Sequence, residues 1–407
     1  MMPPRLLIVE EALKNRQGHW YEYNRAIVVE ARRRGIHTTI LAHQTIEEEL
    51  RLEMDALPYF PVTSWDQAYY HPSEWRRYLG ILRHNFRVAR WMRRHFAANE
   101  PYDVVLVPTV VLYHWLAWRW LAWRGGGRHF RKLVLTTRNN AGEYDSSTGG
   151  YRYGSSAKVL RRILASFRRL VKAGRVELAS DSARLAAQHD ELGGVSFVTY
   201  PHPRPTEHLP LPEARVRDPQ RPIVFSALGP PRFEKGSDLI LAAIRLLREQ
   251  RPDLPARFVL QWNARVYDPQ GTEIAPSVAL ESDPGVEFIR RSLSSAEYQQ
   301  YLEASDVLLV PYRRAQYHAR LSGVAIEAFQ SGVPCICMAD TWIADVMQGI
   351  GAGIAIPEES AEALVRAMID FAEHRNEWQA RSRERMAVAR QAHSPAEFVD
   401  QLFANIP

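Results

Sequence analysis

The chain has few cysteines and no long apolar run. Its 407 residues include two cysteines, Cys335 and Cys337, too few for the disulfide framework of a small secreted domain. They alternate along one apolar stretch, so we expect two buried thiols and a reducing compartment. The N-terminal run LLIV is shorter than a signal-peptide core, and no uncharged run approaches the roughly 20 apolar residues that cross a bilayer. We therefore expect a cytoplasmic protein.

The motifs of several common chemistries are also missing. The sequence has no D-x-D pair for a nucleotide-bound divalent cation, no P-loop, no H-E-x-x-H and no Cys/His spacing typical of zinc. GIGAG (349–353) imitates part of a dinucleotide fingerprint, but it comes late in the chain and not after the first strand, so we interpret it as a turn. We expect no metal and no other cofactor.

Basic residues are in modest excess but are concentrated in two segments. The net charge is +6, from 52 Lys and Arg against 46 Asp and Glu. Residues 74–96 carry seven arginines against one acid, with aromatic residues between them, and residues 158–175 carry seven basic residues and no acid. No helix-turn-helix, zinc or RNA-binding signature accompanies them, so we do not expect a nucleic-acid partner.

The segment 158–175 has an apolar face between its basic residues, and two interpretations stay open. The face can pack on a sheet while the basic side chains meet solvent, or it can lie on an anionic membrane surface, as interfacial helices do. The two can coexist, with the face packed and the basic side chains touching lipid headgroups. The second interpretation predicts a peripheral protein on the inner face of the cell membrane. The apolar face consists of Val159, Leu160, Ile163, Leu164, Phe167, Leu170 and Val171.

Strand and helix patterns alternate along the chain and predict an α/β fold of two doubly wound, Rossmann-like domains. The first series includes a helix at 157–173, preceded by a polar segment, 141–157, that either covers a bound sugar or is mobile. Residues 200–222 contain seven prolines and indicate a connector. We place one domain at 1–204 and a second at 205–389, with a C-terminal helix at about 390–407 packing back on the first domain.

One helix start in the second series has the features of an anion site. Ser322 is a good N-cap, Gly323 leaves room for a ligand, and Arg320 adds a positive charge. The apolar strand 306–312 precedes them, so the helix begins beyond a strand's carboxyl end, where such sheets bind ligands. Glu327 lies one turn further and suits the hydroxyls of a ribose. A capped helix with a solvent-facing acid is the alternative.

The turn GPPRFEKG (229–236) joins another predicted strand to another helix. It carries Arg232 and Lys235, and two cations at a strand's carboxyl end suit the phosphates of a departing nucleotide. With a helix dipole, they can replace a metal ion in neutralising that charge. The alternative is a solvated basic turn.

Taken together, these segments resemble the GT-B glycosyltransferases, in particular the retaining family 4 type that uses nucleotide-sugar donors. The resemblance covers nearly the whole chain in layout, and its specific parts are GPPRFEKG, ASDVLLVPY, SGVAIEAFQSGVPCI and GAGIAIPEES. It implies two domains that face a central cleft, with the acceptor-side domain at 1–204 and the donor-binding domain at 205–389. It also implies roles for seven residues. Arg232, Lys235 and Arg320 would act on the donor diphosphate, Ser322 and Gly323 would contact the donor, Glu327 would bind its ribose, and Gly18 would approach it from the N-terminal domain.

The chain departs from the family pattern at three places. Ala319 replaces the first acid of the usual E-x7-E pair, Pro230 replaces an arginine, and no histidine directly follows the strand at 103–109, where Thr109 is nearest and His114 comes later. The family implies transfer of a sugar from a nucleotide diphosphate sugar to a hydroxyl of a glycan or lipid-linked acceptor, with retention and without metal, in cell-envelope or exopolysaccharide synthesis. A non-catalytic nucleotide-sugar-binding subunit, or a GT-B epimerase or hydrolase, is the alternative.

Overall fold

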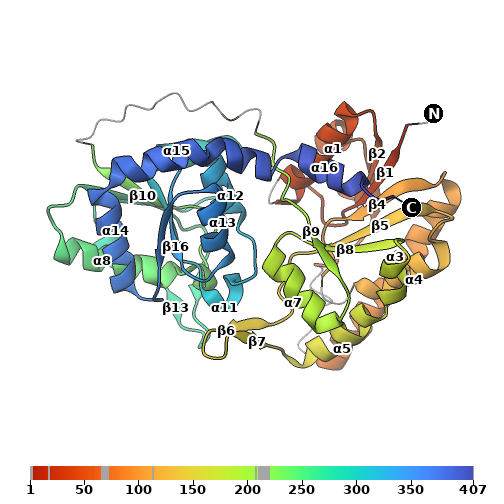
Figure 1. Ribbon diagram of the computed structural model, residues 1–407. Coiled ribbons are helices and arrows are strands. Elements are labelled where there is room, and N and C mark those ends of the chain that lie inside the picture. Colours follow the sequence, from red (N-terminus) through yellow and green to blue (C-terminus); the bar gives the residue numbers. More distant parts are fainter. Residues whose placement is uncertain are drawn as a thin grey trace. The chain divides into compact units, whose positions relative to one another are not determined.

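The computed structural model of the protein describes residues 3–16, 19–65, 73–111, 114–206, 209 and 221–406. By their internal packing these residues form two compact units, each built around its own parallel sheet (Figure 1). The N-terminal unit comprises Met1–Glu143, Tyr151–Pro205 and His393–Pro407, and the C-terminal unit comprises Tyr144–Gly150 and Thr206–Ala392.

The sheet of the N-terminal unit has seven parallel strands among the described residues. Chain order runs outward in both directions from its centre, so the order reverses between two neighbouring strands, β1 and β4. In spatial order the strands are β3 (Ala56–Phe60), β2 (His37–His43), β1 (Arg5–Val9), β4 (Tyr102–Val107), β5 (Phe130–Thr137), β8 (Val176–Ser180) and β9 (Phe197–Thr199).

Helices cover both faces of this sheet, which is why its strands read as continuous apolar runs. Leu7 and Val9 of β1 point to one face, while Leu6 and Ile8 point to the other. The first face packs against α3 (Glu74–Ala98), α4 (Trp115–Gly125), α5 (Ser155–Ala165), α6 (Arg168–Lys172) and α7 (Ala183–Gly193). The second packs against α1 (His19–Arg33), α2 (Glu48–Met54) and α16 (Pro395–Phe403).

The C-terminal helix α16 belongs to the N-terminal unit. Its Phe398 is fully buried and meets the ring of Tyr23 edge-on, with centroids 5.7 Å apart. Arg34 forms an ion pair with Asp400 and donates to the carbonyl of Ala396 at 2.9 Å. These contacts tie the end of the chain to α1.

The predicted single helix at 157–173 is wrong, because the chain forms two helices, α5 and α6, that break at Ser166. The Ser166 hydroxyl donates to the carbonyl of Ile163 at 2.6 Å and accepts from Arg119 at 2.9 Å, so this side chain competes with the helical backbone. The apolar face is buried in the core at Leu160, Leu164 and Phe167, and the basic side chains remain exposed. The packing interpretation of this face is therefore confirmed.

The sheet of the C-terminal unit has six parallel strands in the part of the chain that the structure describes. Its chain order reverses between β10 and β15. In spatial order the strands are β14 (Val286–Ile289), β11 (Ala256–Gln261), β10 (Ile223–Ala227), β15 (Val307–Val310), β16 (Cys335–Met338) and β17 (Gly353–Ile356). Both cysteines are fully buried thiols on β16, as expected. GIGAG (349–353) is not the separate turn that was predicted, because it contains the last two residues of α13 (Trp342–Ile350), a two-residue link and the first residue of β17.

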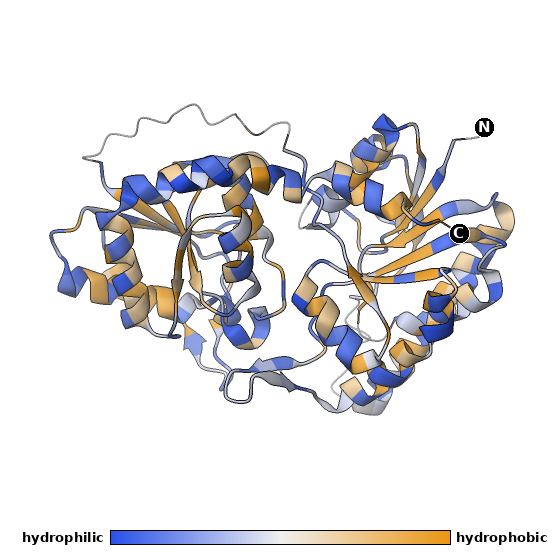
Figure 2. Cartoon of the chain, viewed as in Figure 1, coloured by the Kyte–Doolittle hydropathy of each residue, from blue (hydrophilic) through white to orange (hydrophobic). Residues whose placement is uncertain are grey.

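This second sheet is also covered on both faces, so two doubly wound, Rossmann-like domains are confirmed. Figure 2 shows the apolar strands of both sheets lying between helices of mixed hydropathy. One face packs against α8 (Ser237–Gln250) and α14 (Ala361–Glu373). The other packs against α10 (Ser295–Ala304), α12 (Gly323–Gln330), α13 (Trp342–Ile350) and α15 (Arg375–Ala392).

Short elements complete the fold. The segment 141–157, expected to be polar loop, contains the paired strands β6 (Glu143–Asp145) and β7 (Gly150–Arg152). Their turn is stabilised by a bond of 2.9 Å from the Gly149 amide to the Asp145 carbonyl. The C-terminal unit adds the 3₁₀ turn η2 (Phe233–Lys235), α9 (Val278–Glu281), α11 (Arg314–Tyr317), and a hairpin of β12 (Val266–Tyr267) and β13 (Glu273–Ile274).

Two sequence predictions fall on residues that are not described. Gly18, assigned to the donor site, lies outside the described residues, as does most of the proline-rich connector at 200–222. Across the described residues, no helix is both long and apolar enough to cross a membrane.

Candidate functional site

The candidate donor site lies at the carboxyl ends of β10 and β15. Chain order reverses between these two strands, and in open α/β sheets the crevice at such a switch point is the usual place for a ligand. The turn 228–236 follows β10, and residues 311–322 follow β15 and lead into α12. The turn lies against the start of α12, since a Cβ atom added to Gly229 would be only 3.4 Å from the side chain of Val324.

The turn after β10 is held in one conformation by glycines and by local hydrogen bonds. Gly229 and Gly236 have φ of 89° and 71°, in the left-handed region. The Gly229 amide donates to Gln261 at 2.7 Å, which fixes the turn to the neighbouring strand. The Ser237 hydroxyl accepts from the Arg232 amide at 3.0 Å and donates to the Arg232 carbonyl at 3.0 Å. The backbone that presents Arg232 and Lys235 is therefore rigid.

Lys235 is partly buried within this turn. Its ammonium donates to the Pro230 carbonyl at 3.1 Å and lies 5.7 Å from the centre of the Tyr312 ring. Burial, together with the positive charges of Arg232 and Arg320, lowers the pKa of Lys235 to about 8, against the opposing effect of Glu234 and Glu327. An anion bound here would favour the charged ammonium.

Two arginines flank a single carboxylate beside Lys235. Arg232 and Arg320 come from different segments, and each approaches Glu234, at 3.4 Å and 3.6 Å. The Arg320 guanidinium also lies 4.8 Å from the centre of the Tyr317 ring, which supports it from one side. The sequence analysis assigned no role to Glu234, although this residue lies in the turn 229–236 between Arg232 and Lys235.

The start of α12 has the predicted form. Ser322 is the N-cap, and its hydroxyl accepts from the Ala325 amide at 3.3 Å. A side chain added at Gly323 would meet nothing within 4 Å, so this helix start is open. Glu327, half-buried on α12, lies near enough to act on the charge of Lys235. The structure thus gathers all the predicted donor-site residues that it describes within one unit: Arg232, Lys235, Arg320, Ser322, Gly323 and Glu327.

Residues 221–374 match the family model described as "Glycosyl transferases group 1". The matched range lies within the C-terminal unit. Every residue of the cluster, from Arg232 to Glu327, lies within the matched range. No match was found among curated proteins.

Several solved structures have the same overall fold as this chain. Sucrose-phosphate synthase from Thermosynechococcus elongatus aligns over 98% of both chains with 16% identity and a TM-score of 0.64. Anabaena HepE in complex with UDP-glucose aligns over 98% of both chains with 10% identity and a TM-score of 0.60. The calicheamicin glycosyltransferase CalG4 aligns over 100% of both chains with 17% identity and a TM-score of 0.54. The chain therefore has the GT-B fold, as its sequence predicts.

Proposed function

We propose that this protein is a glycosyltransferase that moves a sugar from a nucleoside diphosphate sugar to a hydroxyl group of an acceptor. The observation that carries the proposal is the cluster of Arg232, Lys235 and Arg320 around one carboxylate at the switch point of the C-terminal sheet. This cluster lies inside the range that matches the group 1 glycosyltransferases.

The cluster suits a departing diphosphate. Negative charge develops on the diphosphate as its bond to the sugar breaks, and charge-assisted hydrogen bonds from Lys235 and the two arginines contribute about 1.5–3 kcal/mol each. The open N-terminus of α12 adds about 0.3–1 kcal/mol through its free amides and its dipole. We propose that these groups neutralise the diphosphate without a divalent ion beside it.

Two carboxylates complete the proposed donor site. Glu327, one turn into α12, is placed to accept hydrogen bonds from the hydroxyls of a ribose. Glu234 occupies the space between Arg232 and Arg320 that a phosphate would take, so donor binding would displace it from at least one arginine. We propose that the segment around Gly18 contributes to the donor from the N-terminal unit, and that transfer proceeds with retention.

We further propose a glycan or lipid-linked acceptor of cell-envelope or exopolysaccharide synthesis, reached at an anionic membrane surface from the cytoplasmic side. Support comes from α3 rather than from the 158–175 segment. Trp75, Leu79, Leu82 and Phe86 recur at helical spacing on α3 and are all exposed. Arg76, Arg83 and Arg90 are exposed beside them. An exposed apolar stripe with arginines along it suits the headgroup region of an anionic membrane.

The test begins with thermal unfolding of the full chain in a panel of nucleoside diphosphates and their sugars. UDP and UDP-glucose lead the panel because the similar fold of HepE was solved with UDP-glucose. A true donor at a hundred times its dissociation constant adds about 2.7 kcal/mol to the free energy of unfolding. A panel in which no nucleotide raises the melting temperature contradicts the proposal.

Substitutions then test the site itself. We expect Lys235→Ala and Glu327→Ala each to lower turnover by about tenfold or more, a loss of at least 1.4 kcal/mol in transition-state stabilisation. Arg366→Ala and Glu362→Ala are the controls, because both side chains are exposed on α14 in the same unit. Near-wild-type turnover in both site variants would reject this donor site.

The same assays separate the alternatives. A non-catalytic subunit would bind the donor without releasing nucleotide, whatever acceptor is offered. A hydrolase or epimerase of the same fold would release free sugar or an epimer without an acceptor. Transfer predicts nucleotide release that depends on an acceptor hydroxyl.

A further inference from the structure

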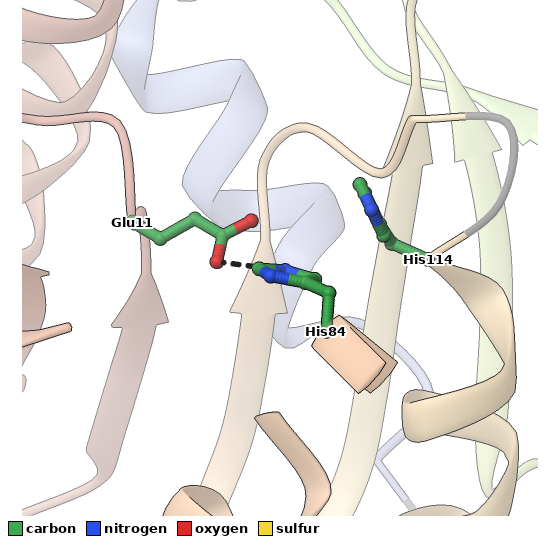
Figure 3. A group of neighbouring side chains, drawn as sticks. All are labelled: Glu11, His84 and His114. Carbon is green, nitrogen blue, oxygen red and sulfur yellow. Dashed lines mark ion pairs between the residues drawn. The ribbon is translucent and has the colours of Figure 1, made fainter. Parts of the chain in front are cut away.

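Three side chains of the N-terminal unit converge at a place that the donor site does not use. They are Glu11, His84 and His114, and their possible ligand atoms all lie within 4.8 Å of one another. Figure 3 shows the Glu11 carboxylate meeting the His84 imidazole, with His114 beside them. Glu11 follows β1, His84 lies in α3, and His114 is the residue before α4.

The cluster stands at the switch point of the N-terminal sheet. Val9 ends β1 and Val107 ends β4, the two neighbouring strands between which chain order reverses, and both line the cavity that holds the three side chains. This position is the usual ligand site of such a sheet. The cavity has a volume of about 20 Å³, enough for one ion or water but not for a sugar.

Hydrogen bonds hold the elements that supply these side chains. The Ser64 amide donates to one carboxylate oxygen of Glu11 at 2.9 Å, and the other oxygen lies 3.2 Å from Nε2 of His84. Asn85, next to His84, accepts from the Ala117 amide of α4 at 2.9 Å, which locks α3 to α4 near His114. Glu11 and His84 are therefore positioned before any ligand arrives.

Burial distinguishes this cluster from surface histidines. The side chain of His84 is 1% exposed and that of Glu11 is 17% exposed. His114 is also buried. The site is thus closed on most sides and open at Glu11, which provides a path for entry.

We propose that Glu11, His84 and His114 bind one divalent first-row transition-metal ion, such as Zn²⁺. Two imidazoles and one carboxylate form a common protein ligand set for a zinc ion that keeps a further position for water or substrate. Bonds of about 2.0–2.1 Å in tetrahedral geometry place ligand atoms about 3.3 Å apart. Glu11 and His84, at 3.2 Å, already meet this requirement. A ligand atom of His114 lies within 4.8 Å of both, so His114 would move closer when the ion binds.

The ligand types also set the selectivity. Imidazole nitrogen suits Zn²⁺, Co²⁺ and Fe²⁺, whereas Mg²⁺ prefers oxygen ligands and keeps several waters. We therefore expect Zn²⁺ and Co²⁺ to bind and Mg²⁺ not to bind. All three proposed ligands belong to the N-terminal unit, so the proposal does not depend on the proposed transfer reaction.

The experiment uses the full chain without a histidine tag, stripped with a chelator and dialysed. Calorimetric titration with Zn²⁺ should give one site per chain, and Co²⁺ should give visible absorption bands typical of nitrogen and oxygen coordination. Mg²⁺ should give neither heat nor bands. Because these readouts record binding alone, they stand even if the protein transfers no sugar.

Three variants and one control locate the ion. Glu11→Gln, His84→Gln and His114→Gln should each weaken Zn²⁺ binding by at least about tenfold, since even outer-shell changes produce losses of this size. Glu11→Gln preserves the shape of the side chain, so its folding should be the least affected, and circular dichroism checks all three. His37→Gln, at an exposed histidine of the same unit, should bind Zn²⁺ like the wild type.

Two results would overturn the proposal. One is the absence of stoichiometric Zn²⁺ and Co²⁺ binding by the wild-type chain, which would leave the cluster as a buried ion pair or a water site. The other is equal affinity in the wild type and in folded Glu11→Gln and His114→Gln, which would place the ion at surface side chains.

Discussion

Within the proposed donor site, Lys235 is the residue whose pKa the surrounding fold shifts most. The turn buries part of its side chain against Tyr312, and this burial lowers the pKa of its ammonium to about 8. Arg232 and Arg320 act in the same direction. An isolated lysine would stay charged far above neutral pH. The charge on Lys235 in the free protein is therefore lost within a range where nucleotide binding can be measured.

We predict that affinity for a nucleoside diphosphate falls as the pH rises above about 8. Below its pKa, Lys235 is mostly charged. Above its pKa, each further pH unit lowers the charged fraction by up to about tenfold. Calorimetric titrations with a nucleoside diphosphate between pH 7 and 9.5 measure this change in affinity. Lys235→Arg is the control, because a guanidinium keeps its charge and titration of the nucleotide itself affects both proteins equally. The same decline in both proteins would contradict the assignment.

Single residues differ in how far sequence could predict their roles. The proposed roles of three residues could be predicted from their positions just after predicted strands, which places them at the same edge of one sheet. These residues are Arg232, Lys235 and Glu327. Glu234 lies in the same turn, but its contacts with two arginines depend on where Arg320 folds back. Glu11, His84 and His114 lie far apart in the chain and match no spacing motif, so only the sheet topology brings them together.

At the scale of elements, α12 was predictable because its ends are encoded locally. Ser322 caps the start of the observed helix Gly323–Gln330, as predicted, and Gly332, with φ of 68°, follows its end. The break between α5 and α6 was not predictable from periodicity. It depends on Arg119 of another helix donating to the Ser166 hydroxyl, a contact that the local sequence does not show.

The turn between β10 and α8 provides a test at the same scale. We predict that Gly236→Ala destabilises the C-terminal unit and lowers donor affinity. Its φ of 71° costs an alanine about 1–2 kcal/mol, and the added carbon would lie 2.5 Å from the Pro311 carbonyl oxygen, which forces the backbone to shift. Urea unfolding and nucleotide binding measure the two effects.

Gly271→Ala is the matched control for that experiment. Gly271 is in the same unit and has φ of 86°, but an added carbon there would meet nothing within 4 Å. It should show only the conformational cost and bind nucleotide normally. Equal destabilisation by the two substitutions would mean that the contact with Pro311 does not constrain the turn.

At the scale of the whole molecule, the two units share one architectural rule. Each sheet reverses its chain order once, at β1 and β4 or at β10 and β15, and each reversal carries a cluster of charged or titratable side chains. The rule was visible in sequence for the C-terminal unit, where the polar residues are contiguous with their strands. In the N-terminal unit, Glu11 and His114 lie in the loops after β1 and β4, but His84 comes from α3, and the three residues match no spacing motif.

The distribution of exposed residues over the molecule leads to the last prediction. Trp75 and Phe86 on α3 are 60% and 69% exposed, in a segment rich in arginine. We expect the full chain to float with anionic vesicles at low salt and to be released as salt rises, because screening weakens contributions of about 1 kcal/mol per arginine. Replacing Trp75 and Phe86 together by glutamine should weaken binding by about tenfold or more, since burying one such side chain contributes about 1.5–3 kcal/mol.

Val388→Gln is the control for this flotation experiment. Val388 lies on α15 of the C-terminal unit and is 52% exposed, so its replacement removes an exposed apolar side chain without touching α3. It should leave flotation unchanged. If the wild type does not bind anionic vesicles at low salt, a membrane-bound acceptor is rejected and a water-soluble glycan becomes the favoured acceptor. If the double variant floats like the wild type, the basic side chains of α5 and α6 remain the surface to test, because they are exposed while their apolar face is buried.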